Sequence, residues 1–171
     1  MRCPDCDCDN IPGAQLCEEC GLDLAGLDIP EADEGLVGRL MTDRLSELTV
    51  ISPLKVAAQT TVEDVIGLLR QEHHGCVLIE DEGKLVGIFT ERDVLVKVLR
   101  PGLDPANVPV SEVMSRDPLT LEPGDPPAFA IHRMVVGGLR HLPVVDGGKL
   151  LGFLSVRDVL RYLHDDVMAE Q

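Results

Sequence analysis

The sequence GIFTERDV at residues 87–94 returns further along the chain as GFLSVRDV at residues 152–159. Both stretches contain an apolar run, then a hydroxyl residue, and then an arginine, an aspartate and a valine. The same shift of 65 positions (87 to 152), without a gap, places the DxGKLxG stretch that starts at Asp81 on the one that starts at Asp146. Gapless matching at one offset indicates an internal duplication of one structural unit.

Each repeat predicts a mixed α/β unit. In the first repeat, hydroxyl residues followed by acids at 60–64 indicate the start of a helix, and apolar residues then recur at helical spacing. The apolar run 76–79 predicts a short buried strand, and Asp-Glu-Gly-Lys at 81–84 predicts a tight turn into a second strand. The remaining expected segments are a helix at about 91–99, a linker at 101–105, and in the second repeat a helix near 127–136, strands at 142–145 and 150–154, and a helix from 156.

Composition narrows the class of protein. The 171 residues suffice for one ordinary domain with a small addition, or for two small domains. Aromatic residues make up only 2% of the chain, so the core is expected to consist of valine, leucine and isoleucine. A net charge of −15 repels phosphate backbones and anionic lipid, so neither nucleic acid nor a membrane is an expected partner. No apolar run approaches the roughly 20 residues that span a bilayer, and the first residues lack a signal-peptide pattern, which predicts a cytoplasmic protein.

Five of the six cysteines lie within the first 20 residues. In a reducing compartment, that crowding favours metal ligation over disulfides. Cys3-x-x-Cys6 and Cys17-x-x-Cys20 form two knuckles whose four thiolates suit one tetrahedral Zn²⁺. Free or redox-active thiols are the alternative interpretation. Because so small a segment has almost no core, its folding is expected to depend on the metal.

This cysteine-rich head resembles short zinc ribbons in which CPxCG is followed by CxxCG. Gly21 fits that pattern, whereas Asp7 replaces the first glycine, a change that aspartate tolerates better than most residues. Cys8 is either a competing ligand or a spare thiol. Arg2 is the only basic residue of the head against six acids, which argues against phosphate binding and favours docking to protein or support of a dimer.

The repeats resemble a tandem pair of CBS domains, the module named after cystathionine β-synthase. VSEVM at 110–114 and LRHLPVVD at 139–146 carry this resemblance together with the two stretches that end each repeat. It implies an α/β (α+β) fold, in which two β-α-β-β-α repeats pack through their sheets as a pseudo-twofold pair, and two such discs associate as a homodimer. The expected organisation is a zinc ribbon at 1–26, an acidic linker and the start of a connecting helix at 27–42, the first CBS domain at 43–100, a linker at 101–109 and the second CBS domain at 110–166.

Two further segments bear on packing and chemistry. Apolar residues at near-helical spacing between Leu36 and Leu48 predict a helix that packs on the first repeat. His73-His74-x-Cys76 contains the residue types of a nucleophile with its base, or of part of a metal site. Cys76, however, begins an apolar strand and is expected to be a buried core residue. We expect no enzymatic activity in this chain, because no segment outside the repeats and the head is long enough to be a catalytic domain.

The hydroxyl and aspartate of each repeat have two interpretations. The local one is a capping box, in which Thr90 with Asp93 and Ser155 with Asp158 stabilise the start of a helix by about 1 kcal/mol. The functional one uses the same helix N-terminus, whose free N–H groups and positive dipole end suit a phosphate. The resemblance implies that Thr90 and Ser155 contact the phosphate of an adenosine nucleotide, and that Asp93 and Asp158 contact its ribose.

The two repeats differ where the middle strand begins. The second has Arg140-His141 there, and the resemblance implies that such basic residues face phosphates, whereas the first has Gly75-Cys76. These cations favour a site that involves the second repeat. A solvated surface position is the alternative for Arg140.

The sequence therefore predicts a non-catalytic sensor: a CBS pair that binds an adenosyl ligand such as AMP, ADP, ATP or S-adenosylmethionine, with a zinc ribbon for interaction or output. An unidentified protein partner is expected to receive the signal. One alternative is a constitutive protein-interaction module in which the hydroxyl–aspartate pairs are only helix caps. Another is a regulator that binds nucleic acid through the ribbon.

Overall fold

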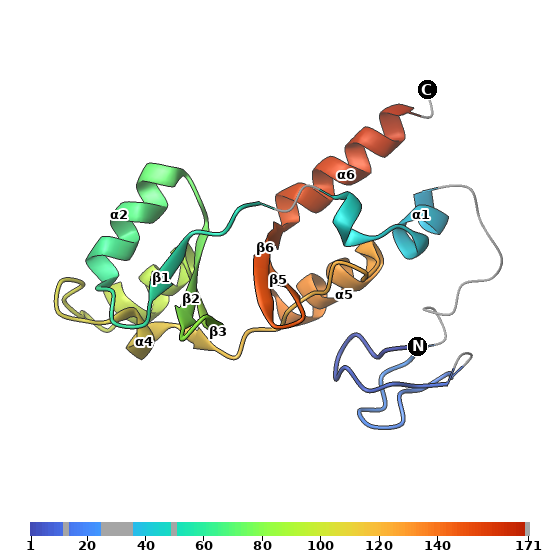
Figure 1. Cartoon of the computed structure of the whole chain (residues 1–171), viewed down its shortest axis with the longest axis horizontal. Coiled ribbons are helices and arrows are strands. Elements are labelled where there is room, and N and C mark those ends of the chain that lie inside the picture. The colour runs from blue at the N-terminus through green and yellow to red at the C-terminus, as the bar shows by residue number, and fades with distance from the viewer. Residues whose placement is uncertain (12–13, 25–35, 49–50, 170–171) are drawn as a thin grey trace. The chain divides into compact units, whose positions relative to one another are not determined.

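The computed structural model describes residues 1–11, 14–24, 36–48 and 51–169 (Figure 1). They form two compact units. The first contains Met1–Leu48, Gly124–Arg140 and Ser155–Gln171, and the second contains Thr49–Pro123 and His141–Leu154. The acidic linker expected from residue 27 lies, up to residue 35, outside the described residues.

The second unit contains a four-stranded sheet in the order β1-β2-β3-β4. β1 runs parallel to β2, and the other two pairs are antiparallel. This arrangement confirms the strand–helix–strand–strand–helix order predicted for the first repeat. Its elements are β1 (Lys55–Ala57), α2 (Val62–Glu72), β2 (Cys76–Asp81), β3 (Lys84–Thr90), α3 (Glu91–Asp93), the π-helical η2 (Val94–Leu99), α4 (Val110–Val113) and β4 (Ser115–Arg116).

The predicted signals at helix and strand ends have clear structural counterparts. The Thr61 side chain accepts a hydrogen bond from the backbone N–H of Asp64, so it caps α2 as its hydroxyl-then-acid sequence predicts. Glu82 and Gly83, with φ of 47° and 78°, form the two-residue turn between β2 and β3. Positive φ at both turn positions matches the right-handed twist of a hairpin, as expected for this sequence.

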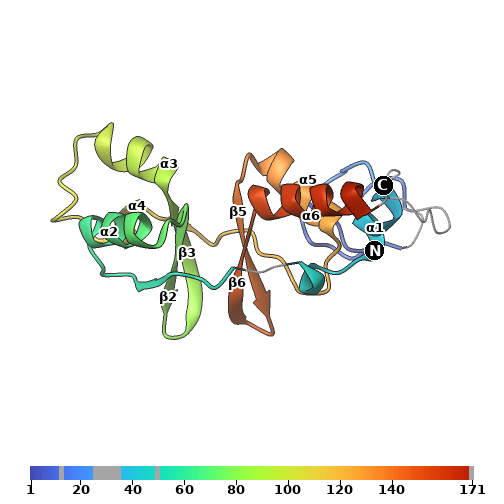
Figure 2. The same cartoon turned by 90° about the horizontal axis from the view of Figure 1, so that it is seen from above.

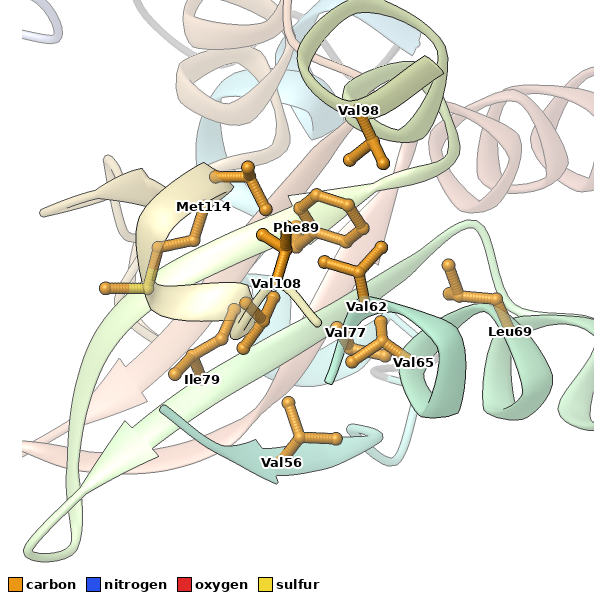
Figure 3. Close-up of a cluster of buried hydrophobic side chains, with 12 residues drawn as sticks. Val56, Val62, Val65, Leu69, Val77, Ile79, Phe89, Val98, Val108 and Met114 are labelled. Atoms are coloured by element: carbon orange, nitrogen blue, oxygen red, sulfur yellow. The ribbon is translucent and has the colours of Figure 1, made fainter. Parts of the chain in front are cut away.

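The sheet of the first repeat is buried on both faces. Val77 and Ile79 of β2 belong to the core beneath the helices. Figure 3 shows the side chains of this core, with Phe89 among them. Cys76 and Leu78, which alternate with them, pack instead in a cluster that includes residues of β5 and β6. Figure 2 shows α2, α3 and α4 on one side of the β2–β3 hairpin and β5–β6 on the other. Packing of the two repeats through their strands, as the resemblance implied, is thus confirmed.

The strands of the second repeat are β5 (His141–Asp146) and β6 (Lys149–Ser155). Leu121 pairs with Val144 in parallel, at positions 65 residues after the Val56–Ile79 pair of the first repeat. The segment that leads into each repeat pairs with the other repeat. β4 joins β3, and Ile51 forms a bridge with Phe153.

The first unit contains the cysteine-rich head, α1 (Leu36–Thr42), η1 (Leu45–Glu47), α5 (Pro127–Gly137) and α6 (Val156–Ala169). The prediction that the 36–48 segment packs on the first repeat is wrong, because α1 contacts α5 and α6, the helices of the second repeat. The helix also ends at Thr42. Asp43 accepts a hydrogen bond from the Tyr162 hydroxyl at 2.6 Å, and Arg44 is extended before Leu45 enters the core.

Gly87 provides a test of the packing between β3 and β4. A Cβ at Gly87 would lie 3.1 Å from the Ser115 carbonyl oxygen and would collide with the Met114 side chain, so Gly87→Ala should destabilise the protein, by about 1–3 kcal/mol. Gly67 in α2 has open space around it, and Gly67→Ala should raise stability, by about 0.5–1 kcal/mol. Urea denaturation measures both changes, and equal effects of the same sign would contradict this account.

Candidate ligand sites and metal centre

Thr90 and Asp93 lie where β3 ends and α3 begins. The Thr90 backbone N–H and hydroxyl both donate to Asp93 Oδ2, at 2.9 and 2.7 Å. The Asp93 backbone N–H donates in return to the Thr90 hydroxyl oxygen at 3.3 Å. This is a complete capping box, so the local interpretation of the motif is confirmed.

Ser155 and Asp158 repeat this geometry at the start of α6. The Ser155 backbone N–H donates to Asp158 Oδ2 at 2.9 Å, and the Ser155 hydroxyl donates to the same oxygen. Both residues are buried, with exposed fractions of 9% and 4%. The duplicated sequence therefore forms the same local structure twice.

A backbone hydrogen bond fixes the first turn of each of these helices. The Glu91 N–H donates to the Gly75 carbonyl at 3.1 Å, and the Val156 N–H donates to the Arg140 carbonyl at 3.0 Å. These contacts connect each helix start to the residue just before the middle strand of its repeat. The Arg140 side chain is exposed.

Lys97 is a neighbour of the first candidate site that was not expected from the sequence. Its ammonium group lies 2.8 Å from Asp93 Oδ1 and donates to the Ser115 hydroxyl at 2.9 Å. The i,i+4 spacing from Asp93 was the available signal, whereas the contact with Ser115 depends on the pairing of β4 with β3.

The second repeat lacks this ion pair. Tyr162 stands at the position of Lys97, and its hydroxyl donates to Asp43. The cation near Asp158 is instead Arg161, whose Nη1 lies 3.5 Å from Asp158 Oδ1. The two aspartates thus share a capping geometry but have different charged neighbours.

His141 lies against the first repeat. A Cβ on Gly75 would be 2.8 Å from its Nε2, so a larger residue at position 75 would have to displace the imidazole. The imidazole also contacts the ring of Phe153 edge-on, with 5.7 Å between ring centroids. Gly75 directly precedes Cys76, which pairs with Thr90, so the structure brings His141 near the strand end that carries Thr90.

Cys76 is fully buried in the cluster between the strands of the two repeats. Burial and the nearby Glu91 carboxylate raise the pKa of its thiol to about 12. The thiol is therefore neutral at physiological pH, as expected for a core residue and unlike a catalytic nucleophile.

The four predicted metal ligands come together. The Sγ atoms of Cys3, Cys6, Cys17 and Cys20 all lie within 4.8 Å of one another. Sγ–Sγ distances are 3.6 Å for Cys3–Cys20 and 3.5 Å for Cys6–Cys17. A tetrahedral Zn²⁺ with Zn–S bonds of about 2.3 Å requires Sγ–Sγ distances of about 3.8 Å, so the thiol set fits this ion. The Cys20 backbone N–H is the main cause that lowers the pKa of Cys17, to about 5.

Two knuckles of matching shape hold these thiols. Asp7 and Gly21, which follow the second cysteine of each knuckle, have φ of 62° and 73°. Their N–H groups donate to the carbonyls of Cys3 and Cys17, at 3.0 and 2.9 Å. Aspartate therefore adopts the left-handed conformation expected at the position where a glycine is usual.

Cys8 is near the cluster but outside the matching knuckle positions. Its Sγ lies 3.4 Å from that of Cys17, and its position corresponds to Leu22 in the second knuckle. The buried Asn10 side chain donates to the Cys8 carbonyl at 3.0 Å. Cys8 is thus held beside the four predicted ligands.

In the part of the chain that the structure describes, we find no helix with the length and apolar character of a membrane span.

Comparison with known proteins agrees with this architecture. The family model for the CBS domain matches residues 37–100 and 110–165. The CBS domain-containing protein CBSCBSPB2 of Arabidopsis thaliana is 32% identical over 124 residues, which cover 72% of this chain and 23% of that protein. The chain therefore spans about a quarter of the length of that relative.

Two solved structures resemble the fold. One is a CBS domain protein of Pyrobaculum aerophilum complexed with AMP, with a TM-score of 0.63, 28% identity, and coverage of 71% of this chain and 98% of that one. The other is the CBS domain pair of protein MJ0100 in complex with 5′-methylthioadenosine and S-adenosyl-L-methionine, with a TM-score of 0.65 and coverage of 72% and 98%. It is 22% identical and supports the fold alone.

The repeated family match, the strand packing and the duplicated capping boxes lead to one conclusion: this chain belongs to the CBS-domain family and contains a tandem CBS pair.

Proposed function

We propose that this protein is a non-catalytic sensor that binds an adenosyl ligand through its CBS pair and a structural Zn²⁺ through its amino-terminal ribbon. The observation that carries the proposal is the duplicated hydroxyl–aspartate pair, placed with the same geometry at two helix starts. The AMP complex of the Pyrobaculum aerophilum protein supports the choice of ligand class. A ligand that binds one conformation of the CBS pair more tightly than another would increase the population of that conformation. The size of the shift is set by the difference between the two affinities.

In this proposal, Thr90 and Ser155 contact phosphate, and Asp93 and Asp158 contact ribose hydroxyls. His141 and Arg140 are the proposed cationic contacts. Each helix start also supplies N–H groups that favour an anion. Ligands consistent with this set are AMP, ADP, ATP and S-adenosylmethionine.

The alternative is a constitutive protein-interaction module. It is favoured by the complete capping boxes, since both carboxylates already accept hydrogen bonds without a ligand. Homodimer formation fits either function. Leu95, Val96 and Leu99 of η2 are 62%, 48% and 55% exposed, and such an apolar helix face is suited to cover by a second copy.

Calorimetry with AMP, ADP, ATP and S-adenosylmethionine tests the sensor function in protein freed of nucleotide. We expect binding that is lost when Asp93→Ala and Asp158→Ala are combined. Asp64→Ala is the matched control, because it removes the corresponding acid from the capped helix α2. No binding at millimolar ligand would favour the interaction module, and binding retained by the double variant would refute these ribose contacts.

Lys97 should weaken ribose binding at the first site. A carboxylate offers about four lone pairs, and Asp93 already uses two on Oδ2 and one on Oδ1. Lys97→Met should therefore raise the affinity for adenosine by up to about tenfold, whereas Arg161→Met, beside Asp158, should change it little because its contact is longer. Calorimetry with adenosine measures both. A loss of affinity in Lys97→Met would identify Lys97 as a ligand contact instead.

Metal analysis tests the ribbon. We expect one zinc per chain after non-denaturing purification without chelator, because zinc joins the two knuckles and stabilises a segment with little core. Cys17→Ser should lose the metal, and Cys8→Ser should retain it. A wild-type protein without metal would overturn the proposal, and metal loss in Cys8→Ser would make Cys8 a ligand.

A further inference from the structure

Arg133 of α5 is a buried cation that donates two hydrogen bonds to the cysteine-rich head. Its side chain is 2% exposed. Its Nε donates to the Pro4 carbonyl at 3.0 Å, and its Nη2 donates to Asp7 Oδ1. Both acceptors belong to the first knuckle or directly follow it. Because a buried guanidinium without hydrogen-bond partners is costly, the position of this knuckle matters to α5.

The ring of Phe129 contacts the guanidinium groups of both Arg133 and Arg2. The Arg133 guanidinium lies 4.5 Å from the centre of the Phe129 ring, and that of Arg2 lies 5.1 Å from it. Arg2 also donates to Asp125 Oδ1 at 2.6 Å, just before α5, and lies 3.5 Å from Asp7. One cation from the head and one from the helix therefore meet the same ring and the same carboxylate.

Asp7 has two roles in this arrangement. Its backbone provides the left-handed turn that closes the first knuckle, and its carboxylate accepts from Arg133. Gly21, at the matching position of the second knuckle, provides only the turn. The replacement of glycine by aspartate in the first knuckle thus adds a contact that glycine cannot make.

We propose that the ribbon is a metal-dependent clamp on α5 of the second CBS repeat. A metal held by the four thiols fixes the knuckle that presents the Pro4 carbonyl and the Asp7 carboxylate to Arg133. Loss of the metal removes that constraint, weakens the two hydrogen bonds that the buried guanidinium donates to the head, and loosens the attachment of α5 to the head. The inference rests on the proposed metal site and identifies the ribbon's protein partner as this chain's own second repeat.

Coupling of this kind works in both directions. If the metal stabilises the contact with Arg133, then that contact stabilises metal binding by the same free energy. Metal occupancy would then also change the stability of α5, through preferential binding to the clamped state. The clamp therefore connects the ribbon to the repeat that carries Ser155 and Asp158.

Hydrogen exchange on the full-length protein tests the clamp. Amide exchange in α5 is compared among zinc-loaded protein, protein treated with chelator, and treated protein given Zn²⁺ again. We expect exchange in α5 to become at least about tenfold faster without metal and to recover with Zn²⁺. Peptides of α2, in the other unit, serve as the internal control. Exchange in α5 that is unchanged by metal removal would overturn the clamp and leave the zinc site intact.

Asp7→Gly separates the clamp from the metal site. Glycine accommodates the φ of 62°, so this variant should still bind one zinc per chain. Its α5 should nevertheless exchange faster than that of the wild type in the zinc-loaded form, because one of the two acceptors for Arg133 is lost. Asp5→Asn is the control, since it removes a charge from the same knuckle without removing the acceptor for Arg133. A zinc-loaded Asp7→Gly protein with wild-type exchange in α5 would refute the proposal, whereas failure of the wild type to bind metal would refute the metal site itself.

Arg133→Met gives a second, independent variant. Methionine fills similar space without a charge, and circular dichroism would show that the CBS pair remains folded. Its α5 should also exchange fast when zinc is bound. Its zinc affinity should fall, as measured by competition with a chromogenic chelator. Unchanged exchange in this variant would contradict the clamp.

Discussion

The alternation of side chains along β2 is the constraint on which the second unit depends. Val77 and Ile79 face the helical core, and Cys76 and Leu78 face the strands of the second repeat. A strand buried on both faces must be apolar throughout, and the sequence CVLI satisfies this requirement. At the end of this hairpin, Gly75 lies beside Thr90 and contacts both the first residue of α3 and the His141 imidazole.

Much of this fold was predictable because its signals are local. The caps at Thr61, Thr90 and Ser155 and the left-handed residue in each knuckle follow from residue types at short spacing. The duplication at a fixed offset then predicted the second repeat from the first. Partners distant in sequence were harder to predict. Nothing near Leu36 indicates that α1 packs on the helices of the second repeat, and nothing near Arg133 indicates that its acceptors lie about 126 residues earlier.

In the candidate sites, too, the local features were predictable from sequence and the neighbours from distant segments were not. Their hydroxyl and carboxylate residues were identified from sequence, and the structure places them in capping boxes that are already complete. What distinguishes the two sites is the set of neighbours. Lys97 forms an ion pair with Asp93 in the first repeat. Tyr162 takes the position of Lys97 in the second repeat, and its hydroxyl donates to Asp43. The two repeats therefore share the capping geometry but differ in the side chains that surround the two aspartates.

The pairing of each lead-in segment with the other repeat has a consequence for how such a chain is assembled. β4 completes the sheet of the first repeat, and Ile51 pairs with the last strand of the second. A single repeat expressed alone would have an unpaired strand edge and a lead-in segment without its partner. Two copies of that fragment could satisfy both by exchanging lead-in segments across a twofold axis. The tandem chain thus contains, within one polypeptide, the strand pairing that such a swapped dimer would form between two.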